Sequence, residues 1–161
     1  MLLARLYHLN GQFDEAIAYG GQAVALSPNN AKVAAVFSAV STQSGRPERG
    51  LEMMKKTMRL NPYPEDWYQA FLGLAYIFTE RHEEAFTPLK KCSDRIPDYI
   101  FCHVHLIFAY MEAGREAEAR AEAKEVLRIN PNFSSDSWVL AYKDPAVRKR
   151  MVSHLQKAGL P

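Results

Sequence analysis

The tripeptide Ile129-Asn130-Pro131 has two counterparts upstream in the chain, Leu60-Asn61-Pro62 and Leu26-Ser27-Pro28. Together with Pro97, the prolines of these tripeptides form a series with successive spacings of 34, 35 and 34 residues. Proline ends a helical run because it lacks a backbone N–H donor and disfavours helical geometry at the residue before it. The series therefore marks the ends of four units of nearly constant length.

Each unit has a turn signal near its middle. Counted back from the prolines, Gly11, Gly45 and Gly114 fall at one common position, and Glu80 stands there in the third unit. Glycine tolerates the positive φ that the chain needs where a helix stops and turns. We expect the same turn at Glu80, at a cost of about 0.5 to 1 kcal/mol. Each unit is therefore predicted to be two helices joined by a turn.

Large and small residues recur in register with these turns. Two antiparallel helices approach closely only where one facing side chain is small, and a neighbouring aromatic ring fills the space beside it. The second unit departs from the pattern, with Ser41 and Gly50 at the two positions. The residues that follow the pattern are Tyr7, Tyr76 and Tyr110 in first helices and Ala16, Ala85 and Ala119 in second helices.

The composition also favours helices. Ala, Leu, Glu, Lys and Arg are plentiful, Gly and Pro are few and regularly placed, and no segment reads as a strand. We expect helices at residues 1–10, 14–26, 31–43, 47–60, 65–79, 82–94, 98–112 and 116–128, then a short segment at 135–141 and a last helix at 145–158.

The last predicted helix has its own start and stop signals. Asp144 suits the N-cap, Pro145 the first helical position and Gly159 the end. The apolar residues of this helix form one stripe, which would cover the face that the last unit of a stacked array leaves open. A membrane-surface helix is the alternative, but the stripe is short and lacks aromatic residues. The stripe consists of Val147, Met151, Val152 and Leu155.

The first unit lacks its normal beginning. Met1 falls inside the first helix of the unit, and no N-cap precedes it. Leu2, Leu3, Leu6 and Leu9 would then expose apolar surface that a preceding unit covers in a longer array. We expect the isolated chain to self-associate through this edge, and the chain to be part of a longer protein.

The register of Tyr, Gly, Ala and Pro resembles the tetratricopeptide repeat over residues 1 to about 131. The resemblance implies an all-α fold, a right-handed α-α superhelix of about four repeats, with residues 132–161 as a C-terminal capping segment. Such repeats serve as protein interaction or oligomerisation modules and have no catalytic residues of their own. The implied repeats are 1–30, which is truncated at its N-terminus, 31–64, 65–98 and 99–131.

A narrower resemblance points to bacterial signalling proteins. Four segments are similar to the C-terminal repeat region of bacterial class III adenylate or guanylate cyclases: NPYPEDWY at 61–68, LGLAY at 72–76, YKDP at 142–145 and KAGLP at 157–161. In such proteins the repeats follow a catalytic or DNA-binding domain and serve regulation, oligomerisation or partner binding. A cyclase holds two metal ions with paired aspartates on a sheet, and this sequence offers neither a sheet nor such a pair of aspartates. We therefore expect a regulatory repeat region and not an enzyme.

The family resemblance also implies a concave groove lined by the first helix of each repeat. Projected onto this chain, the groove is apolar and aromatic, which suits an apolar strip such as an amphipathic helix or a segment of the parent chain's own upstream domain. The carboxylate clamp of some relatives is absent, because Val36, Trp67 and Phe71 stand in its place. The predicted groove residues are Trp67, Phe71, Leu74, Phe78, Phe101, Val104, His105, Phe108 and Met111.

Two alternatives to this groove stay open at this stage. The same residues could bind a small or lipid-like molecule, for which a closed pocket among Trp67, Phe71, Phe108 and Met111 would argue. The aromatic residues could also be core, packed against the adjacent repeat. An open trough would instead favour a polypeptide partner.

Net charge and motifs argue against nucleic-acid binding, membrane insertion and catalysis. The formal net charge of +2 gives no chain-wide field that would draw the protein onto nucleic acid, and the basic residues Lys143 and 148–150 are expected to form a solvated face. The apolar start is interrupted by Arg5 too early for a signal peptide or a membrane span. No phosphate-binding loop or nucleophile motif is present in the sequence.

The cysteines and histidines do not form a recognisable metal or redox site in the sequence. Cys92 and Cys102 are too few for a disulfide framework and belong to no paired-cysteine motif, which favours a reducing, cytoplasmic setting. Cys102 and His105 share a helix face while His103 points elsewhere, so the cluster lacks a third metal ligand. We expect no metal, no cofactor and no redox role for Cys92.

Overall fold

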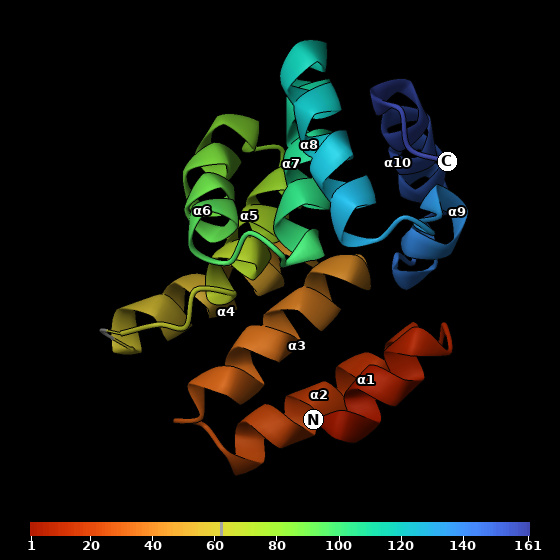
Figure 1. Cartoon of the computed structure of the whole chain (residues 1–161). Coiled ribbons are helices and arrows are strands. Elements are labelled where there is room, and N and C mark those ends of the chain that lie inside the picture. Colours follow the sequence, from red (N-terminus) through yellow and green to blue (C-terminus); the bar gives the residue numbers. More distant parts are fainter. Residues whose placement is uncertain (62) are drawn as a thin grey trace.

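The computed structural model describes residues 1–61 and 63–161, and the regular structure throughout this part of the chain is helical (Figure 1). The predicted repeat boundary at Pro62 lies outside the described residues. The elements in chain order are α1 (Leu2–Leu9), α2 (Phe13–Leu26), α3 (Ala31–Gln43), α4 (Pro47–Leu60), α5 (Tyr68–Phe78), α6 (His82–Arg95), α7 (Ile100–Glu112), α8 (Glu116–Ile129), α9 (Ser135–Trp138), the 3-10 helix η1 (Val139–Ala141) and α10 (Pro145–Ala158).

Consecutive helices form four pairs, α1–α2, α3–α4, α5–α6 and α7–α8, and each pair packs on the next. The first helices also contact one another, α1 with α3, α3 with α5 and α5 with α7. Ala16, Ala85 and Ala119 are fully buried, so the predicted small residues lie where neighbouring helices meet. The result is the α-α solenoid that the sequence predicts.

Most predicted helix bounds agree with the structure within two residues, and those of α3, α4 and α10 agree at both ends. The largest difference is at α5, which begins at Tyr68 and not at residue 65. The backbone N–H of Tyr68 donates to the carbonyl of Glu65 at 2.9 Å, and that of Gln69 donates to Asp66 at 3.1 Å. These three-residue spacings show that a tight turn of 3-10 type precedes the helix.

The second pair, whose sequence departs from the repeat pattern, has a close contact of its own. A Cβ atom at Gly50 would come within 2.8 Å of the carbonyl oxygen of Ser38. The Ser38 hydroxyl donates a hydrogen bond of 2.7 Å to the Gly50 carbonyl. Gly50 replaces the expected alanine because α4 lies against the backbone of α3 at this point.

The turns within the pairs use the left-handed region of φ. The values are +73° at Gly11, +80° at Gly45 and +70° at Gly114. Glu80 has φ of +60° in the equivalent turn, and no other non-glycine residue of the described chain has a positive φ. The turn predicted for the third unit is confirmed, with a side chain where glycine would fit better.

The segment after α8 covers the end of the array. α10 packs on α7 and α8 and buries Met151 and Leu155 in the main core. The side chain of Asp144 accepts a 2.8 Å hydrogen bond from the backbone N–H of Ala146, and Gly159 ends the helix with φ of +105°. The predicted capping helix is confirmed, together with its start and stop residues.

At the opposite end, α1 leaves apolar side chains exposed. The exposed fractions are 75% for Leu2, 47% for Leu3, 49% for Leu6 and 70% for Leu9. No repeat covers this face in the described chain, so the open edge expected from the sequence is present.

Replacing Glu80 by glycine should stabilise the fold. The substitution removes the left-handed strain but adds freedom to the unfolded chain, and the expected net gain in the free energy of unfolding is about 0.5 kcal/mol. Gly114→Ala places a side chain at the matching turn of the next pair and should lose about 1 kcal/mol. Urea denaturation followed by circular dichroism measures both, and a loss of stability for Glu80→Gly would contradict the strain argument.

Candidate functional site

A pocket of about 590 Å³, here called the concave pocket, lies on the inner side of the solenoid. It is bounded by α1, α3, α5, the start of α7 and η1, so residues far apart in the sequence meet in it. Most of its lining is apolar. The lining residues are Arg5, His8, Leu9, Val36, Ala39, Val40, Gln43, Trp67, Phe71, Leu74, Ile96, Tyr99, Phe101 and Ala141.

A second hollow of similar size, about 600 Å³, lies at the turn between α2 and α3. It is lined largely by polar groups, including Asn29, Asn30 and Lys32, and its described lining is separate from that of the concave pocket. A binding site is usually apolar with a few placed polar groups, which describes the concave pocket better.

The aromatic side chains of the concave pocket are held in place by neighbours. Trp67 and Phe71 meet edge to face, with ring centroids 5.3 Å apart. The indole N–H of Trp67 donates to the carboxylate of Glu65 at 2.7 Å, and Lys32 lies 3.0 Å from the other Glu65 oxygen. The Trp67 ring is therefore oriented in the free protein, which lowers the entropy cost of binding.

The C-terminal segment forms one wall of the concave pocket. The 3-10 helix η1 packs against α1, so that Ala141 and His8 line the same pocket, and the backbone N–H of Lys143 donates to the carbonyl of Gln43 at 2.8 Å. The Lys143 ammonium also lies 2.9 Å from a carboxylate oxygen of Asp14. Figure 1 shows α9 and the following turn returning toward α1. These contacts bound the concave pocket, so it is not an open trough.

Four of the nine predicted groove residues line the concave pocket: Trp67, Phe71, Leu74 and Phe101. Binding by these residues stays a prediction. The predicted groove lacked five residues that also line the concave pocket: Arg5, His8 and Leu9 of α1, and Ile96 and Tyr99 at the α6–α7 turn. Projection from the repeat pattern could have found the α1 residues, because they occupy the inner face of a first helix.

The other five predicted groove residues are not part of the concave pocket's lining. Val104, His105 and Phe108 are fully buried, so the expectation that they form an accessible groove along α7 is wrong. For His105 and Phe108 the reason is the C-terminal segment: His105 Nε2 lies 3.2 Å from the Tyr142 hydroxyl, and the Phe108 ring lies 5.4 Å from that of His154. The capping segment itself therefore occupies the inner face of α7.

Phe78 and Met111 are partly buried against the same core. Phe78 stacks on Tyr142 with a centroid distance of 5.3 Å. Burial lowers the pKa of His105 to about 3, so its ring is neutral beneath the segment. For this part of the predicted groove, the alternative that the aromatic residues are core describes the structure better.

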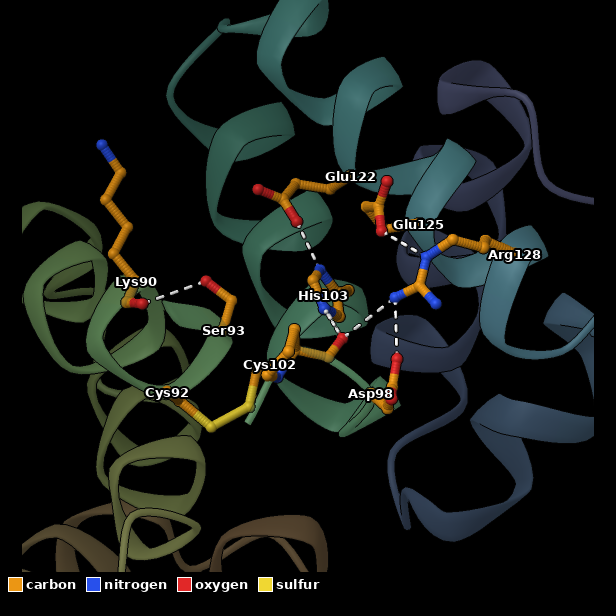
Figure 2. A network of polar contacts seen from close by, with 10 residues as sticks. Lys90, Cys92, Ser93, Asp98, Cys102, His103, Glu122, Glu125 and Arg128 are labelled. Carbon is orange, nitrogen blue, oxygen red and sulfur yellow. Dashed lines mark hydrogen bonds and ion pairs between the residues drawn. A yellow bond between two sulfur atoms is a disulfide. The ribbon is translucent and has the colours of Figure 1, made fainter. Parts of the chain in front are cut away.

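The two cysteines are paired (Figure 2). Cys92, in the last turn of α6, and Cys102, in the first turn of α7, form a disulfide with their Cα atoms 5.9 Å apart. The sequence had indicated no pairing of Cys92 with Cys102, and this expectation is wrong because the turn at Pro97 brings the two helix ends together. Disulfides are rare in cytosolic proteins, so the cysteines no longer favour a reducing, cytoplasmic setting.

His103 is the centre of a polar network beside this disulfide (Figure 2). Its Nδ1 lies 2.6 Å from a carboxylate oxygen of Glu122, and its Nε2 lies 2.8 Å from the carbonyl oxygen of Pro97. Both partners are acceptors, so only the doubly protonated ring donates to both. Burial acts to lower the pKa of His103, but the hydrogen bonds to Glu122 and Pro97 and the nearby carboxylates outweigh it and raise the pKa.

Metal ligands, membrane-spanning helices and the C-terminal basic residues were considered next as signs of another function. No group of three or more His, Cys, Asp or Glu side chains in residues 1–61 and 63–161 could hold a metal ion. In the same residues, no helix combines the length and apolar character needed to cross a membrane. Among the C-terminal basic residues, Lys143 pairs with Asp14 and Arg150 lies 3.2 Å from Glu112.

Comparison with known proteins places the fold. A family model described as tetratricopeptide repeat matches residues 1–30. A search of curated proteins gave no significant match. Among solved structures, the thermophilic TPR protein TTC0263 of Thermus thermophilus is similar, with a TM-score of 0.70 and 23% identity over 96% of this chain and 78% of that one.

Two further solved structures have the same architecture. MamA has a TM-score of 0.64 and 22% identity over 98% of this chain and 93% of that one. YrrB, described as a TPR protein with an unusual peptide-binding site, has a TM-score of 0.59 and 17% identity over 96% of this chain and 80% of that one. These similarities confirm the predicted tetratricopeptide-type solenoid.

Stability should depend on pH through His103. A histidine whose folded pKa is raised contributes stability that is fully present below the unfolded pKa and is lost as pH rises through the folded pKa. We expect His103→Gln to cost about 1.5 to 3 kcal/mol at pH 6 and clearly less at pH 9.

Urea denaturation of the parent and of His103→Gln across this pH range measures the difference. Glu122→Gln removes the carboxylate partner of His103 and should give the same trend. A stability difference that stays constant from pH 6 to pH 9 would show that the ring is not protonated in the folded protein.

Proposed function

We propose that this chain is a non-enzymatic interaction module that binds a short apolar or amphipathic polypeptide segment in the concave pocket. The observation that carries the proposal is the aromatic and aliphatic lining of this pocket on the inner face of the first helices. Large rigid rings supply much contact area at a low entropy cost, which is typical of recognition surfaces.

The dimensions of the concave pocket limit what can bind. A volume of about 590 Å³ falls in the range of ordinary ligand sites and accommodates a few bulky side chains. A long helix laid along the whole array, as the sequence suggested, would collide with the segment at Ala141 and Tyr142, which already covers α7. A short segment that inserts apolar side chains fits this shape better. The description of YrrB as a protein with a peptide-binding site agrees with a peptide ligand on this fold.

A small or lipid-like molecule is the alternative ligand, and one observation favours it. The C-terminal segment closes the concave pocket on one side, which suits a compact molecule as well as a peptide.

The biological setting that we propose is the regulatory repeat region of a bacterial signalling protein. The segments at 61–68, 72–76 and 142–145, which resemble the cyclase-associated repeat region, support this setting.

Selection from a random dodecapeptide phage library tests the proposal. The parent chain should enrich peptides with two or more bulky apolar residues. Phe71→Ala and Leu9→Lys should lose these peptides; Leu9 is 70% exposed, so its replacement leaves the core intact. Tyr63→Ala, at a residue 90% exposed and outside the concave pocket, is the matched control and should keep them.

Two outcomes would decide against a peptide in the concave pocket. Equal enrichment on the parent and on both pocket variants would place the binding elsewhere. If no peptide is enriched while the intrinsic tryptophan fluorescence responds to a fatty acid, the small-ligand alternative is favoured.

A second candidate function is self-association through α1. The exposed leucines of α1, here called the α1 edge (Leu2, Leu3, Leu6 and Leu9), form an apolar face on one helix. Contiguous apolar patches of this kind mark interaction sites more often than scattered exposed residues do. The other end of the solenoid is covered by α10, so we propose that two copies pair edge to edge.

Light scattering after size exclusion tests this pairing. The parent should show a dimer whose fraction rises with concentration, and a Leu3→Lys, Leu6→Lys double variant should be a monomer. Leu26→Lys, at a residue 84% exposed and outside the α1 edge, should dimerise like the parent. A parent chain that stays monomeric at the highest concentration would rule the pairing out.

A further inference from the structure

We infer that the peptide bound in the concave pocket carries an acidic side chain next to its bulky apolar residues, and that this carboxylate pairs with Arg5. The inference rests on the proposed function and adds a charge requirement to it. Its basis is the distribution of charge around the concave pocket, which is one-sided.

Among the described residues that line the concave pocket, Arg5 is the one that is permanently charged. The same described lining includes no aspartate or glutamate, so nothing in it would attract a basic ligand. His8, the other basic residue, is kept neutral, because burial lowers its pKa and the nearby charge of Arg5 lowers it further. The charge that a ligand meets in the concave pocket is therefore a single positive one.

Arg5 forms no ion pair with a carboxylate of the described residues. Other cations near the inner face differ in this respect. Lys143 pairs with Asp14, and Lys32 is held by Glu65. Because the Arg5 side chain is exposed on α1, a ligand carboxylate can reach it without moving the core.

The position of Arg5 also fits an amphipathic ligand. Arg5 lines the concave pocket together with His8 of α1 and Tyr99 of the α6–α7 turn. Leu9, one helical turn further along α1, lines the same pocket. If the apolar side chains of a bound segment enter beside Leu9 and Phe71, the adjacent residue of that segment lies close to the Arg5 guanidinium. An acidic residue there gains an ion pair, and a basic one is repelled.

Parallel selections test the charge requirement separately from binding itself. The same dodecapeptide library is panned on the full parent chain, on Arg5→Glu and on Arg59→Glu, which changes an exposed arginine outside the concave pocket. The parent and Arg59→Glu should enrich peptides with Asp or Glu at a constant spacing from the apolar residues. Arg5→Glu should enrich Lys or Arg at that place.

The strongest parent peptide is then synthesised with an amidated C-terminus, so that only side-chain carboxylates are present. Replacing its acidic residue by the corresponding amide should weaken binding to the parent about two- to fivefold, the range for an exposed ion pair. The same replacement should leave binding to Arg5→Gln unchanged.

The outcomes distinguish a failure of the charge requirement from a failure of peptide binding itself. Enriched apolar peptides without a charge preference, or with the same preference on Arg5→Glu, would overturn the role of Arg5 and leave the proposed function standing. An absence of any enriched peptide on the parent would overturn the proposed function, and the charge requirement with it.

Discussion

The whole structure depends on one packing constraint, which is that a helix pair of this chain has apolar residues on more faces than it can cover alone. Leu74 and Ile77 of α5, and Leu106 and Phe108 of α7, are buried only because a neighbouring element lies against each side. Stacking of the pairs satisfies this need in the middle of the array. At its ends the need remains, so α10 covers one end and the α1 edge stays exposed at the other.

The covering of the last repeat has a second effect on the inner face. The segment that leads into α10 passes over α7 and contacts the first two repeats, through the packing of η1 on α1 and through Lys143. The buried ring of Tyr142 lies against His105 of α7 and Phe78 of α5 on this inner face. The same residues therefore end the solenoid and shorten its groove to the concave pocket. Stability of the C-terminal half and the size of the concave pocket are coupled in this way.

Polar groups divide between structure and recognition according to their partners. In the fourth repeat, His103 and its acceptors Glu122 and Pro97 form a closed set that connects α7 to α8 and to the turn before α7. The disulfide between Cys92 and Cys102 joins α6 to α7 at the same level. These groups have their partners within the protein and hold the scaffold. Arg5 has no carboxylate partner in the part of the chain that the structure describes, and this difference is the basis for our proposal that it pairs with a ligand carboxylate.

The sequence by itself determined the local architecture of this protein. Proline spacing, turn glycines and buried alanines depend on backbone geometry within about 34 residues, and they predicted the helices, the strained turn at Glu80 and the capping helix. Only the tertiary structure decided which rings are accessible, because His105 and Phe108 are covered by a segment more than thirty residues later in the chain. It also decided the pairing of Cys92 with Cys102 and the membership of Arg5 in the concave pocket. These features depend on contacts between separate repeats, and a sequence pattern within one repeat does not specify such contacts.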